Sequence, residues 1–439
     1  MNITVIGTGY VGLVAVTCLA DAGNNCIGVD IDEEKIKKLR RGEVPFYEPG
    51  LEEIMHANLR EERLSFTTDM EKAIKEAGVI FIAVGTPEND DGSADLQHVL
   101  AVAETIGRNA NGEKVVVLKS TVPVGTNRRV REAISALTPH HISVVNNPEF
   151  LKEGSAIDDF QKPDRVVIGC EDEKATKVML EIYSPFVRTG KPILIMDPAS
   201  AEMTKYAANT MLATRISLMN ELSQLCERVG ADIEMVRRGI GTDSRIGSSF
   251  LFAGIGFGGS CFPKDISALR KTGEEYGLDL KLTRAVEDVN ARQKQMMFEK
   301  ISAHYNGKLK GLAFAVWGLA FKPRTDDMRE APAIITINQL LGAGAAISAF
   351  DPAAMETAHR IFGSKIKLCE KAFDTLAGAN ALLIMTEWNE FRIPALERVK
   401  ATLVKPVIFD GRNLYDGQHM AEMGFTYYSI GRKTYRPAQ

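Results

Sequence analysis

A cysteine in a glycine-rich turn is the residue of this sequence best suited to covalent chemistry. The segment Gly258-Gly259-Ser260-Cys261-Phe262-Pro263-Lys264-Asp265 places Cys261 directly before a helix that Pro263 can start. Unpaired N–H groups and the positive end of the helix dipole favour a thiolate there, and the thiolate is the nucleophilic form. Asp265 follows one helical turn later, close enough to act on a proton or a water. Taken alone, however, a free cysteine is more often a small buried apolar residue.

A phosphate-binding fingerprint stands at the start of the chain. The β-rich run Ile3 to Ile6 leads into Gly7-Thr8-Gly9-Tyr10-Val11-Gly12, a G-x-G-x-x-G motif, and then into an apolar helical pattern. The glycines allow a tight turn and let the backbone approach a pyrophosphate at a helix N-terminus. A second run, Cys26 to Val29, ends at Asp30, near the spacing expected for a carboxylate that binds ribose hydroxyls. Asp30 therefore favours NAD over NADP, although Lys35 weakens that preference.

The composition limits the classes of protein that the chain can represent. With 439 residues, 45% of them hydrophobic, and a net charge of −4, the sequence indicates two or three domains and nothing suited to nucleic acid or an anionic membrane. Neither a signal peptide nor a membrane-spanning run is expected. The six cysteines form no C-x-x-C pair, so we expect a reduced, cytoplasmic protein without structural zinc or another metal.

Short β-rich runs alternate with helical patterns through the first half of the chain. This alternation predicts an α/β fold with a doubly wound, mostly parallel sheet. The loops that follow three of these runs, at Gly85-Thr86-Pro87, Ser120-Thr121-Val122-Pro123 and Asn146 to Leu151, should face a cofactor, since ligands bind at the carboxyl ends of such strands. The runs are 79–84, 114–118, 142–145, 165–168 and 193–196.

A long helix is predicted from about Ala199 to Val229, because this stretch has no internal glycine or proline. Thirty residues at 1.5 Å each extend roughly 45 Å, enough to join two domains. Lys205 and Asn209 are four residues apart and share one face. The apolar positions occupy more than one face, which favours a homodimer or a larger homo-oligomer through this helix.

The last third of the chain repeats the order strand, turn, helix, strand and acid. The run 312–318 is followed by a helical pattern and by Ala346 to Asp351, and the runs 381–385 and 406–410 fit two more strands. The glycine fingerprint is missing, because Gly318 is followed by Leu319-Ala320-Phe321-Lys322. A lysine at this place suggests a differently bound phosphate, such as that of a nucleotide sugar. We therefore expect two Rossmann-like domains, 1–198 for NAD and 301–439 for the nucleotide sugar, joined by a central helical domain, 199–300.

The motifs together resemble those of the UDP-glucose/GDP-mannose dehydrogenases over essentially the whole chain. Members of this family oxidise the C6 alcohol of a sugar to an acid with two NAD per turnover, which the resemblance implies here. The likeness around Arg245-Ile246-Gly247 and Cys261 favours UDP-glucose; GDP-mannose or a UDP-N-acetylhexosamine is the alternative. The motifs are Gly7 to Gly12, Ser120-Thr121-Val122-Pro123, Asn147-Pro148-Glu149-Phe150-Leu151, Gly256 to Asp265, Gly318 to Lys322 and Phe409-Asp410-Gly411-Arg412.

The resemblance also implies roles in catalysis. Cys261 would add to an aldehyde at C6, so that a second oxidation gives a thioester. Lys205 and Asn209 would stabilise the developing oxyanion. Asp265 with a water would act as base, Thr121 would position that water, and Glu149 would assist thioester hydrolysis. How the proton transfers divide among Lys205, Asp265 and Glu149 stays open.

Binding residues follow from the same resemblance. Phe252 departs from the family, whose members often carry Tyr or Lys there against the diphosphate. Residues matching Arg245 and Arg412 can reach the neighbouring subunit's site in this family. The cofactor set is Gly7, Gly9, Tyr10, Val11, Gly12, Asp30, Lys35, Thr86, Thr121, Glu153, Lys264 and Arg329. The nucleotide-sugar set is Glu149, Phe150, Leu151, Lys205, Asn209, Arg245, Phe250, Phe252, Gly258, Phe321, Lys322 and Arg412.

Two other functions must be weighed against this one. A β-hydroxyacid dehydrogenase that performs a single oxidation shares the N-terminal fold but needs neither Cys261 nor the second Rossmann-like half. A non-catalytic protein that binds NAD or a nucleotide sugar does not need a reactive thiol. Counting the NADH formed per substrate separates the three possibilities, which give two, one and none.

Overall fold

The computed structural model describes residues 1–188 and 190–438. The chain divides into two compact units, which are described separately. Unit 1 consists of 1–208 and 267–278, and unit 2 of 209–266 and 279–439. The division passes through two helices, α9 (Pro198–Val229) and α11 (Phe262–Glu275), which contribute residues to both units.

Unit 1 is built on a sheet in the order β3-β2-β1-β4-β5-β6-β7-β8. All neighbouring strands are parallel except β6 and β7, which confirms the predicted doubly wound, mostly parallel sheet. The strands are β1 (Asn2–Ile6), β2 (Asn25–Val29), β3 (Leu64–Thr67), β4 (Val79–Ile82), β5 (Lys114–Leu118), β6 (Ile142–Asn146), β7 (Val166–Gly169) and β8 (Ile193–Met196). Only the short β3 has no counterpart among the predicted runs of this unit.

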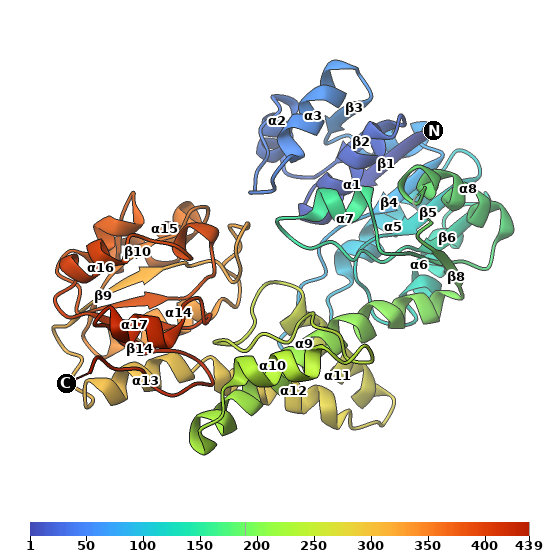
Figure 1. Cartoon of the computed structure of the whole chain (residues 1–439). Coiled ribbons are helices and arrows are strands. Elements are labelled where there is room, and N and C mark those ends of the chain that lie inside the picture. Colours follow the sequence, from blue (N-terminus) through green and yellow to red (C-terminus); the bar gives the residue numbers. More distant parts are fainter. Residues whose placement is uncertain (189, 439) are drawn as a thin grey trace. The chain divides into compact units, whose positions relative to one another are not determined.

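Helices cover both faces of this sheet (Figure 1). Side chains of one group of helices pack with Ile3, Val5 and Phe81 on one face, and those of the other group pack with Ile6, Ile80 and Ile82 on the opposite face. The first group is α1 (Tyr10–Asp21), α2 (Glu33–Arg40), α3 (Leu51–Arg60), α7 (Ala156–Gln161) and α8 (Glu173–Tyr183). The second group is α4 (Met70–Glu76), α5 (Gln97–Asn109) and α6 (Thr126–Ser135).

The turn between β1 and α1 requires two of its glycines on steric grounds. Gly7 has φ +98°, and a Cβ there would lie 2.6 Å from the carbonyl oxygen of Ala83. A Cβ on Gly12 would lie 1.8 Å from the carbonyl oxygen of Gly7. By contrast, no described atom lies within 4 Å of a Cβ built on Gly9, at the start of α1. The backbone at Gly9 is therefore open to a ligand.

Unit 2 carries a second sheet in the order β11-β10-β9-β12-β13-β14, which repeats the order of the first six strands of unit 1. Its neighbouring strands are parallel. The strands are β9 (Ala313–Trp317), β10 (Ala346–Phe350), β11 (Lys367–Leu368), β12 (Ala381–Ile384), β13 (Val407–Asp410) and β14 (Thr426–Tyr428). The predicted second Rossmann-like sheet is thereby confirmed, while β11 and β14 are too short to have been predicted.

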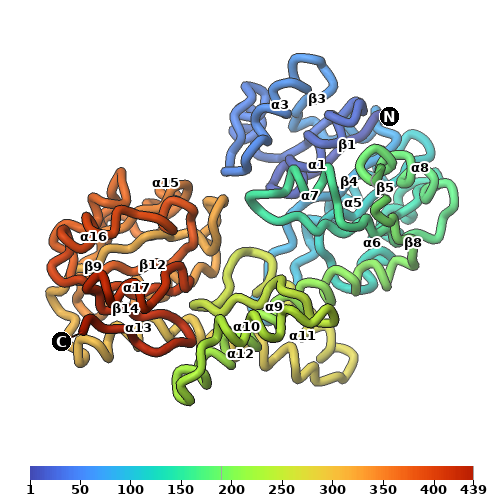
Figure 2. Tube along the Cα trace, viewed as in Figure 1, coloured from blue at the N-terminus to red at the C-terminus, as the bar shows by residue number. Residues whose placement is uncertain are grey.

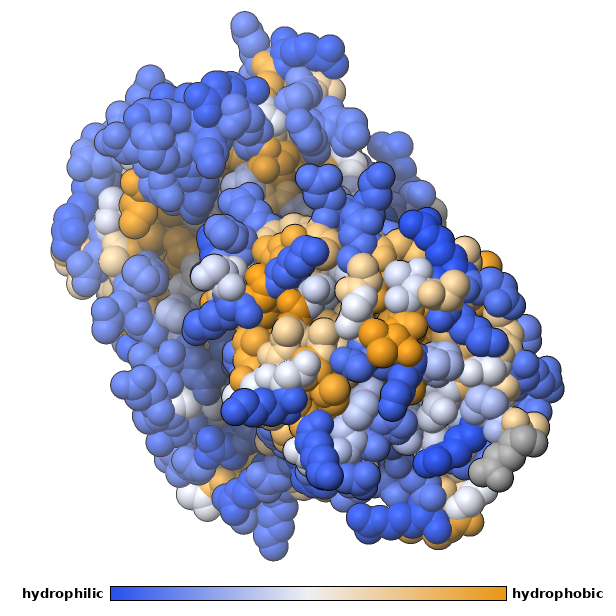
Figure 3. Space-filling model, turned by 90° about the vertical axis from the view of Figure 1, so that its left-hand side faces the viewer, coloured by the Kyte–Doolittle hydropathy of each residue, from blue (hydrophilic) through white to orange (hydrophobic). Residues whose placement is uncertain are grey.

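Apolar layers again lie on both faces of the second sheet. α13 (Met296–His304), α14 (Pro332–Gly342) and α15 (Met355–Phe362) pack on one face, and α16 (Leu396–Thr402) and α17 (Gly417–Glu422) on the other. The C-terminal segment lies beside α13, where Arg436 acts electrostatically on His304 (Figure 2). Seen from outside, apolar side chains interrupt the hydrophilic surface of this part of the chain in several places (Figure 3).

α9 runs without interruption from Pro198 to Val229, as predicted. It is followed in unit 2 by α10 (Ile233–Gly241) and, after α11, by α12 (Lys281–Gln293). Within the described residues, none of the helices is both long enough and apolar enough to cross a membrane.

One buried carboxylate fixes the first turn of the second sheet. Asp351, directly after β10, is fully buried and accepts hydrogen bonds from the backbone N–H groups of Leu319 (2.7 Å) and Ala320 (3.1 Å). It also accepts from the Trp388 indole (3.2 Å) and from two N–H groups of its own loop, those of Ala353 and Ala354. Its position after β10 matches that of Asp30 after β2. Both oxygens of Asp351, however, accept hydrogen bonds from the protein itself.

Replacing Asp351 should lower the stability of unit 2 and leave the stability of unit 1 unchanged. In Asp351→Ala, buried N–H donors lose their acceptor, and each such loss costs about 1–3 kcal/mol. We expect a clear fall in the melting temperature of the second sheet, measured by calorimetry. Asp374→Ala, at an exposed site of the same unit, is the control and should melt as the wild type does. Equal melting of both variants would contradict the structural role of Asp351.

Candidate active site

Cys261 is set apart from the other cysteines by its exposure. It lies directly before α11 and is partly exposed, and its carbonyl oxygen accepts from the N–H of Asp265 (2.9 Å). Cys18, Cys26, Cys170, Cys226 and Cys369 are all buried. Burial raises the pKa of Cys26 to about 12 and also raises the pKa values of Cys18, Cys226 and Cys369. Cys261 is therefore the thiol that a ligand can reach.

The carboxylate one turn beyond Cys261 holds two predicted site residues of unit 2. Asp265 is 1% exposed, and its Oδ2 accepts from Asn209 Nδ2 (2.6 Å) while its Oδ1 accepts from Lys264 Nζ (2.8 Å). Asn209 is itself buried. The amide of Asn209 is thus oriented by Asp265, a relation between α9 and α11 that the sequence did not reveal.

The glycines before Cys261 allow another predicted segment to approach. A Cβ on Gly258 would lie 2.4 Å from the carbonyl oxygen of Glu330. Gly259 has φ +85°, donates its N–H to the carbonyl oxygen of Arg329 (2.8 Å), and would touch the Phe321 ring if it carried a Cβ. The structure therefore brings Phe321 and Arg329 to the turn that bears Cys261.

Arg412 lies at the carboxyl ends of the strands of the second sheet. Its Nε donates to the carbonyl oxygen of Met385 (2.9 Å), and its second terminal nitrogen donates to that of Phe321 (3.0 Å). Glu387 forms an ion pair with Arg412 at 3.3 Å. Lys322 follows Phe321, with its ammonium 5.4 Å from the centre of the Phe321 ring. Arg412 and Lys322 thus both lie at the carboxyl ends of the strands of this sheet.

The loop from Arg245 to Phe252 is held by an arginine that the sequence did not single out. Arg215 on α9 donates to the carbonyl oxygens of Ile246, Gly247 and Ser249, at 2.9–3.0 Å. Arg245 itself is largely exposed and pairs with Asp243. In the same loop, Phe250 has φ +60°.

Phe252, where the sequence departs from the family, is 63% exposed. The guanidinium of Arg237 stacks over its ring, 4.4 Å from the ring centre. An aromatic ring can hold a cation in this way without a hydroxyl group.

A buried ion pair forms the core of the site in unit 1. Lys205 Nζ lies 2.9 Å from Glu149 Oε1, and both side chains are 5% exposed. Burial alone would raise the pKa of Glu149, but the charge and hydrogen bond of Lys205, the N–H of Leu151 and the charge of Lys119 outweigh it and lower the pKa. The Phe150 ring lies between Lys205 and Arg165, 5.3 Å and 3.5 Å from their charged groups. Glu149 is therefore held as a carboxylate.

Thr121 and Lys205 line the same small pocket. The Thr121 carbonyl oxygen accepts from the hydroxyl of Thr86 (2.9 Å). Glu202, which the sequence analysis did not identify, lines the pocket as well and accepts from the N–H groups of Gly125 (2.6 Å) and Asn127 (2.7 Å) at the start of α6. Glu202 thereby holds the loop that carries Thr121.

The turn with the glycine fingerprint is supported by two carboxylates. Asp30 Oδ2 accepts from the N–H (3.0 Å) and hydroxyl (2.8 Å) of Thr8 and from Lys35 Nζ (2.9 Å). Burial acts to raise the pKa of Asp30, yet these hydrogen bonds lower it. The second carboxylate, Glu48, accepts from the Tyr10 hydroxyl (2.5 Å) and from two backbone N–H groups at Gly154 and Ala156. Glu48 was not predicted; it joins this turn to the loop that contains Glu153.

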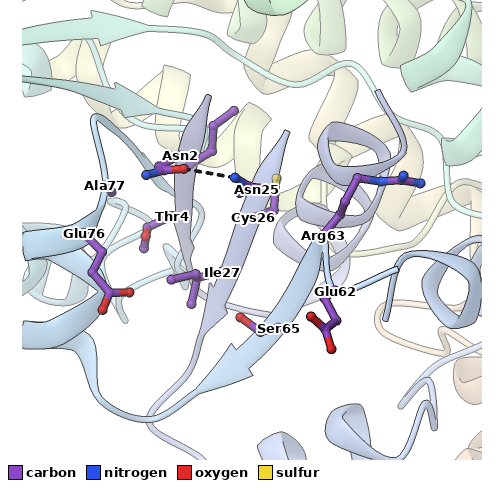
Figure 4. A pocket seen from close by; sticks show the side chains of 11 residues that line it. Asn2, Thr4, Asn25, Cys26, Ile27, Glu62, Arg63, Ser65, Glu76 and Ala77 are labelled. Atoms are coloured by element: carbon purple, nitrogen blue, oxygen red, sulfur yellow. Dashed lines mark hydrogen bonds between the residues drawn. The ribbon is translucent and has the colours of Figure 1, made fainter. Parts of the chain in front are cut away.

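A hollow of unit 1 lies at the opposite end of the strands (Figure 4). This cavity of about 160 Å³ lies where β1, β2 and β3 begin. Asn25 donates to Asn2 there (3.3 Å), and Glu62 and Glu76 also line it. Open α/β sheets bind ligands at the carboxyl ends of their strands, so this cavity is not assigned to the active site.

Three consecutive parts of the chain match domains of a single family. Residues 1–187 match the NAD binding domain, 199–292 the central domain and 315–417 the UDP binding domain of the UDP-glucose/GDP-mannose dehydrogenase family. A protein named UDP-glucose 6-dehydrogenase from Pseudomonas aeruginosa is 47% identical over 98% of each chain. The chain belongs to the UDP-glucose/GDP-mannose dehydrogenase family.

Solved structures of this family share the fold. A UDP-glucose dehydrogenase from Pyrobaculum islandicum matches 98% of this chain and 97% of its own, with a TM-score of 0.91 and 39% identity. A UDP-D-ManNAc dehydrogenase from Pyrococcus horikoshii matches 98% of this chain and 99% of its own, with a TM-score of 0.86 and 27% identity. Members named for different sugars therefore keep the same architecture, and the fold alone does not select the sugar.

The described residues fit the NAD that this family's first domain binds. Gly9 leaves bare backbone at the start of α1, where a pyrophosphate needs N–H donors. Asp30, directly after β2, would be the acceptor for ribose hydroxyls that such a fold places there. Lys35 neutralises part of its charge.

Removing the Asp30 carboxylate should weaken NAD binding by roughly tenfold or more, because an acceptor of charge-assisted hydrogen bonds is lost. The preference for NAD over NADP should narrow at the same time, since the repulsion of a 2′-phosphate disappears. Titrations of Asp30→Ala with NAD and NADP measure both effects. Asp69→Ala, which removes the N-cap of α4 instead, serves as the control. Unchanged affinities in Asp30→Ala would mean that this acid does not contact the ribose.

Proposed function

We propose that the protein oxidises UDP-glucose to UDP-glucuronate, using two NAD for each sugar. The similarity to proteins named UDP-glucose 6-dehydrogenase over 98% of the chain supports this substrate. The observation that carries the proposal is the exposure of Cys261 while the other five cysteines are buried. A dehydrogenase that stops at the aldehyde has no need of such a thiol.

The four-electron reaction requires an adduct on the protein. The Cys261 thiolate adds to the C6 aldehyde, and the resulting thiohemiacetal can be oxidised again to a thioester. Water then releases the acid and regenerates the thiol. Bound NAD accepts the hydride in each oxidation.

The buried pair of unit 1 supplies charges of both signs for these steps. The Lys205 ammonium stabilises the oxyanion that develops at C6. Glu149, whose pKa is lowered, is available as a carboxylate to assist hydrolysis of the thioester. Thr121, in the pocket of Lys205, positions the reacting water.

In unit 2 we assign Asn209 to the same oxygen of the sugar. Asp265 accepts the Nδ2 hydrogen of Asn209 and so fixes the direction of the amide. Each oxygen of Asp265 accepts one of these hydrogen bonds and keeps a further lone pair, which can accept from a water. We therefore propose that Asp265 orients Asn209 and acts with a water as base, the role that the resemblance implies.

The nucleotide is assigned to the carboxyl ends of the second sheet. Lys322 and Arg412 provide positive charge there, and Phe321 lies against the turn of Gly259. The loop from Arg245 to Phe252 and the backbone at Gly258 complete the proposed nucleotide-sugar site. Phe150 and Leu151 complete the sugar site in unit 1.

We propose three functional regions, 1–198 for NAD, 199–300 for the centre and 301–439 for the nucleotide sugar. Glu153, Lys264 and Arg329 belong to the NAD set named from the sequence, and we keep them in the proposed site. Six reduced thiols are compatible with the cytoplasm, where we place the protein.

Replacing the nucleophile should abolish formation of the acid. Cys261→Ser should lower the rate of NADH formation from UDP-glucose by about 10³-fold or more, because an alcohol is a far weaker nucleophile at neutral pH. The wild type should form two NADH per UDP-glucose and react more slowly with GDP-mannose and UDP-N-acetylglucosamine at equal concentration. Cys369→Ala, at a buried thiol of the same unit, should keep full activity. One NADH per sugar in the wild type would instead indicate a single oxidation.

We also propose that the protein is a homodimer through α9. Met211, Leu218 and Leu225 follow one another at intervals of seven residues, and each is about half exposed or more. Such a repeat forms a continuous apolar stripe suited to a second helix of the same kind.

A charge in this stripe should separate the subunits. Leu218→Glu places a carboxylate opposite its own copy across a two-fold axis, so we expect a shift from dimer to monomer in light scattering at micromolar concentration. Leu282→Glu changes an equally apolar, exposed residue on α12 and should remain dimeric. A wild-type protein that is monomeric and fully active would refute the proposal.

A further inference from the structure

A second buried lysine lies near the pair formed by Glu149 and Lys205 in unit 1. Lys119 follows β5 directly and is 4% exposed. Its ammonium donates to Asn147 Oδ1 (3.0 Å) and to the Tyr183 hydroxyl (3.3 Å), and the centre of the Phe160 ring lies 5.8 Å away. All three partners are neutral, and among the described residues no carboxylate forms an ion pair with Lys119. The charge of Lys119 is therefore not cancelled locally.

Lys119 also holds the turn that carries Glu149. Asn147, its hydrogen-bond partner, precedes Glu149 by two residues. The backbone N–H of Asn147 donates to the carbonyl oxygen of Leu118 (2.9 Å), and its Nδ2 donates to that of Val167 (2.9 Å). The Tyr183 hydroxyl donates to the same Oδ1 that accepts from Lys119. Both polar atoms of the Asn147 side chain are thus hydrogen-bonded, and this holds the backbone before Glu149 in place.

The charges of Lys119 and Glu149 act on each other. Burial lowers the pKa of Lys119 to about 8, with Glu149 raising it and Lys205 lowering it. In return, Lys119 is one of the groups that lower the pKa of Glu149. Arg165, beside Phe150, also interacts electrostatically with Glu149. Glu149 thus lies in the field of three cations, of which Lys205 alone touches it.

We propose that Lys119 is a positioning residue for Glu149, fixing its turn through Asn147 and supplying the positive charge that keeps Glu149 ionised while Lys205 is engaged with the substrate oxygen. This role rests on the proposed oxidation of UDP-glucose. During hydrolysis of the thioester, Glu149 must accept a proton from water, and the ammonium of Lys205 is then shared with the oxyanion. Lys119 is buried and hydrogen-bonded to Asn147 and Tyr183, so its ammonium does not move to the oxyanion.

Burial of a lysine is not by itself evidence for this role, and the same strand supplies the comparison. Lys114, at the other end of β5, is also buried and donates to the carbonyl oxygen of Ala77 (2.7 Å). Its pKa is likewise lowered by burial, but no charged residue contributes to that shift. Lys114 is therefore a matched control with the same burial and without the neighbouring carboxylate.

The test is the pH dependence of kcat for UDP-glucose oxidation, measured from the lowest pH at which the protein stays folded up to about pH 9, because the pKa of Glu149 lies below its ordinary value. Removing a cation raises the pKa of a nearby carboxylate. In Lys119→Met the acid limb of the kcat profile should therefore move to higher pH, by about one pH unit. The ratio of variant to wild-type kcat should then drop about tenfold toward low pH. Well above the pKa of Glu149 the carboxylate is ionised in both proteins, so the ratio should become constant there. Lys119→Arg should follow the wild type on the acid side, and Lys114→Met throughout.

A ratio for Lys119→Met that is independent of pH would show that Lys119 acts only as a structural support and would overturn its electrostatic role. If Lys119→Met does not fold, Asn147→Asp decides, because a carboxylate beside Lys119 cancels its charge without removing it; its acid limb should shift in the same direction, and an unshifted limb refutes the proposal. A wild type that forms no NADH from UDP-glucose would overturn the proposed function itself, and this role with it.

Discussion

The ion pair between Glu149 and Lys205 is the interaction around which unit 1 is arranged. Two charges that are each 5% exposed lose most of their hydration, and a buried pair of this kind rarely improves stability over apolar packing. The surrounding structure compensates for that loss. The N–H of Leu151 donates to Glu149, the Phe150 ring faces Lys205, and Lys119 adds a further cation. Such an arrangement is understandable as a site kept ready for a reaction in which charge develops.

The two sheets show how one topology can be adapted to two uses. The first six strands of unit 1 and the six strands of unit 2 have the same order, and an acid follows the second strand in each. In unit 1, Asp30 accepts from Thr8 and Lys35 close to a turn with open backbone. In unit 2, Asp351 accepts hydrogen bonds from backbone N–H groups and from the Trp388 indole. The acid of the second sheet therefore serves the structure of its own turn.

Sequence reasoning succeeded where an element of structure is encoded in consecutive residues. Seven of the eight strands of unit 1, the long helix and the turns bearing Gly7, Thr121 and Cys261 were expected from local patterns. It missed β11 and β14, which have only two and three residues, and β3, whose Leu-Ser-Phe-Thr is half polar while β4 of the same length is wholly apolar. It also missed Glu48, Lys119, Glu202 and Arg215, whose partners lie far away along the chain, as Glu48 does from Gly154. Such a residue can be identified from the sequence only when its distant hydrogen-bond or ion-pair partner is known.

The distribution of thiols has a practical consequence. Since Cys261 is the partly exposed sulfur and the other five are enclosed in the interior, alkylation under mild conditions titrates one group per chain. The number of sulfurs modified then counts the competent active sites in a preparation. The same selectivity concentrates oxidative damage, because peroxide converts an accessible thiolate to sulfenic acid before it reaches enclosed ones. Inactivation by an oxidant would follow single-hit kinetics and be reversed by a thiol reductant.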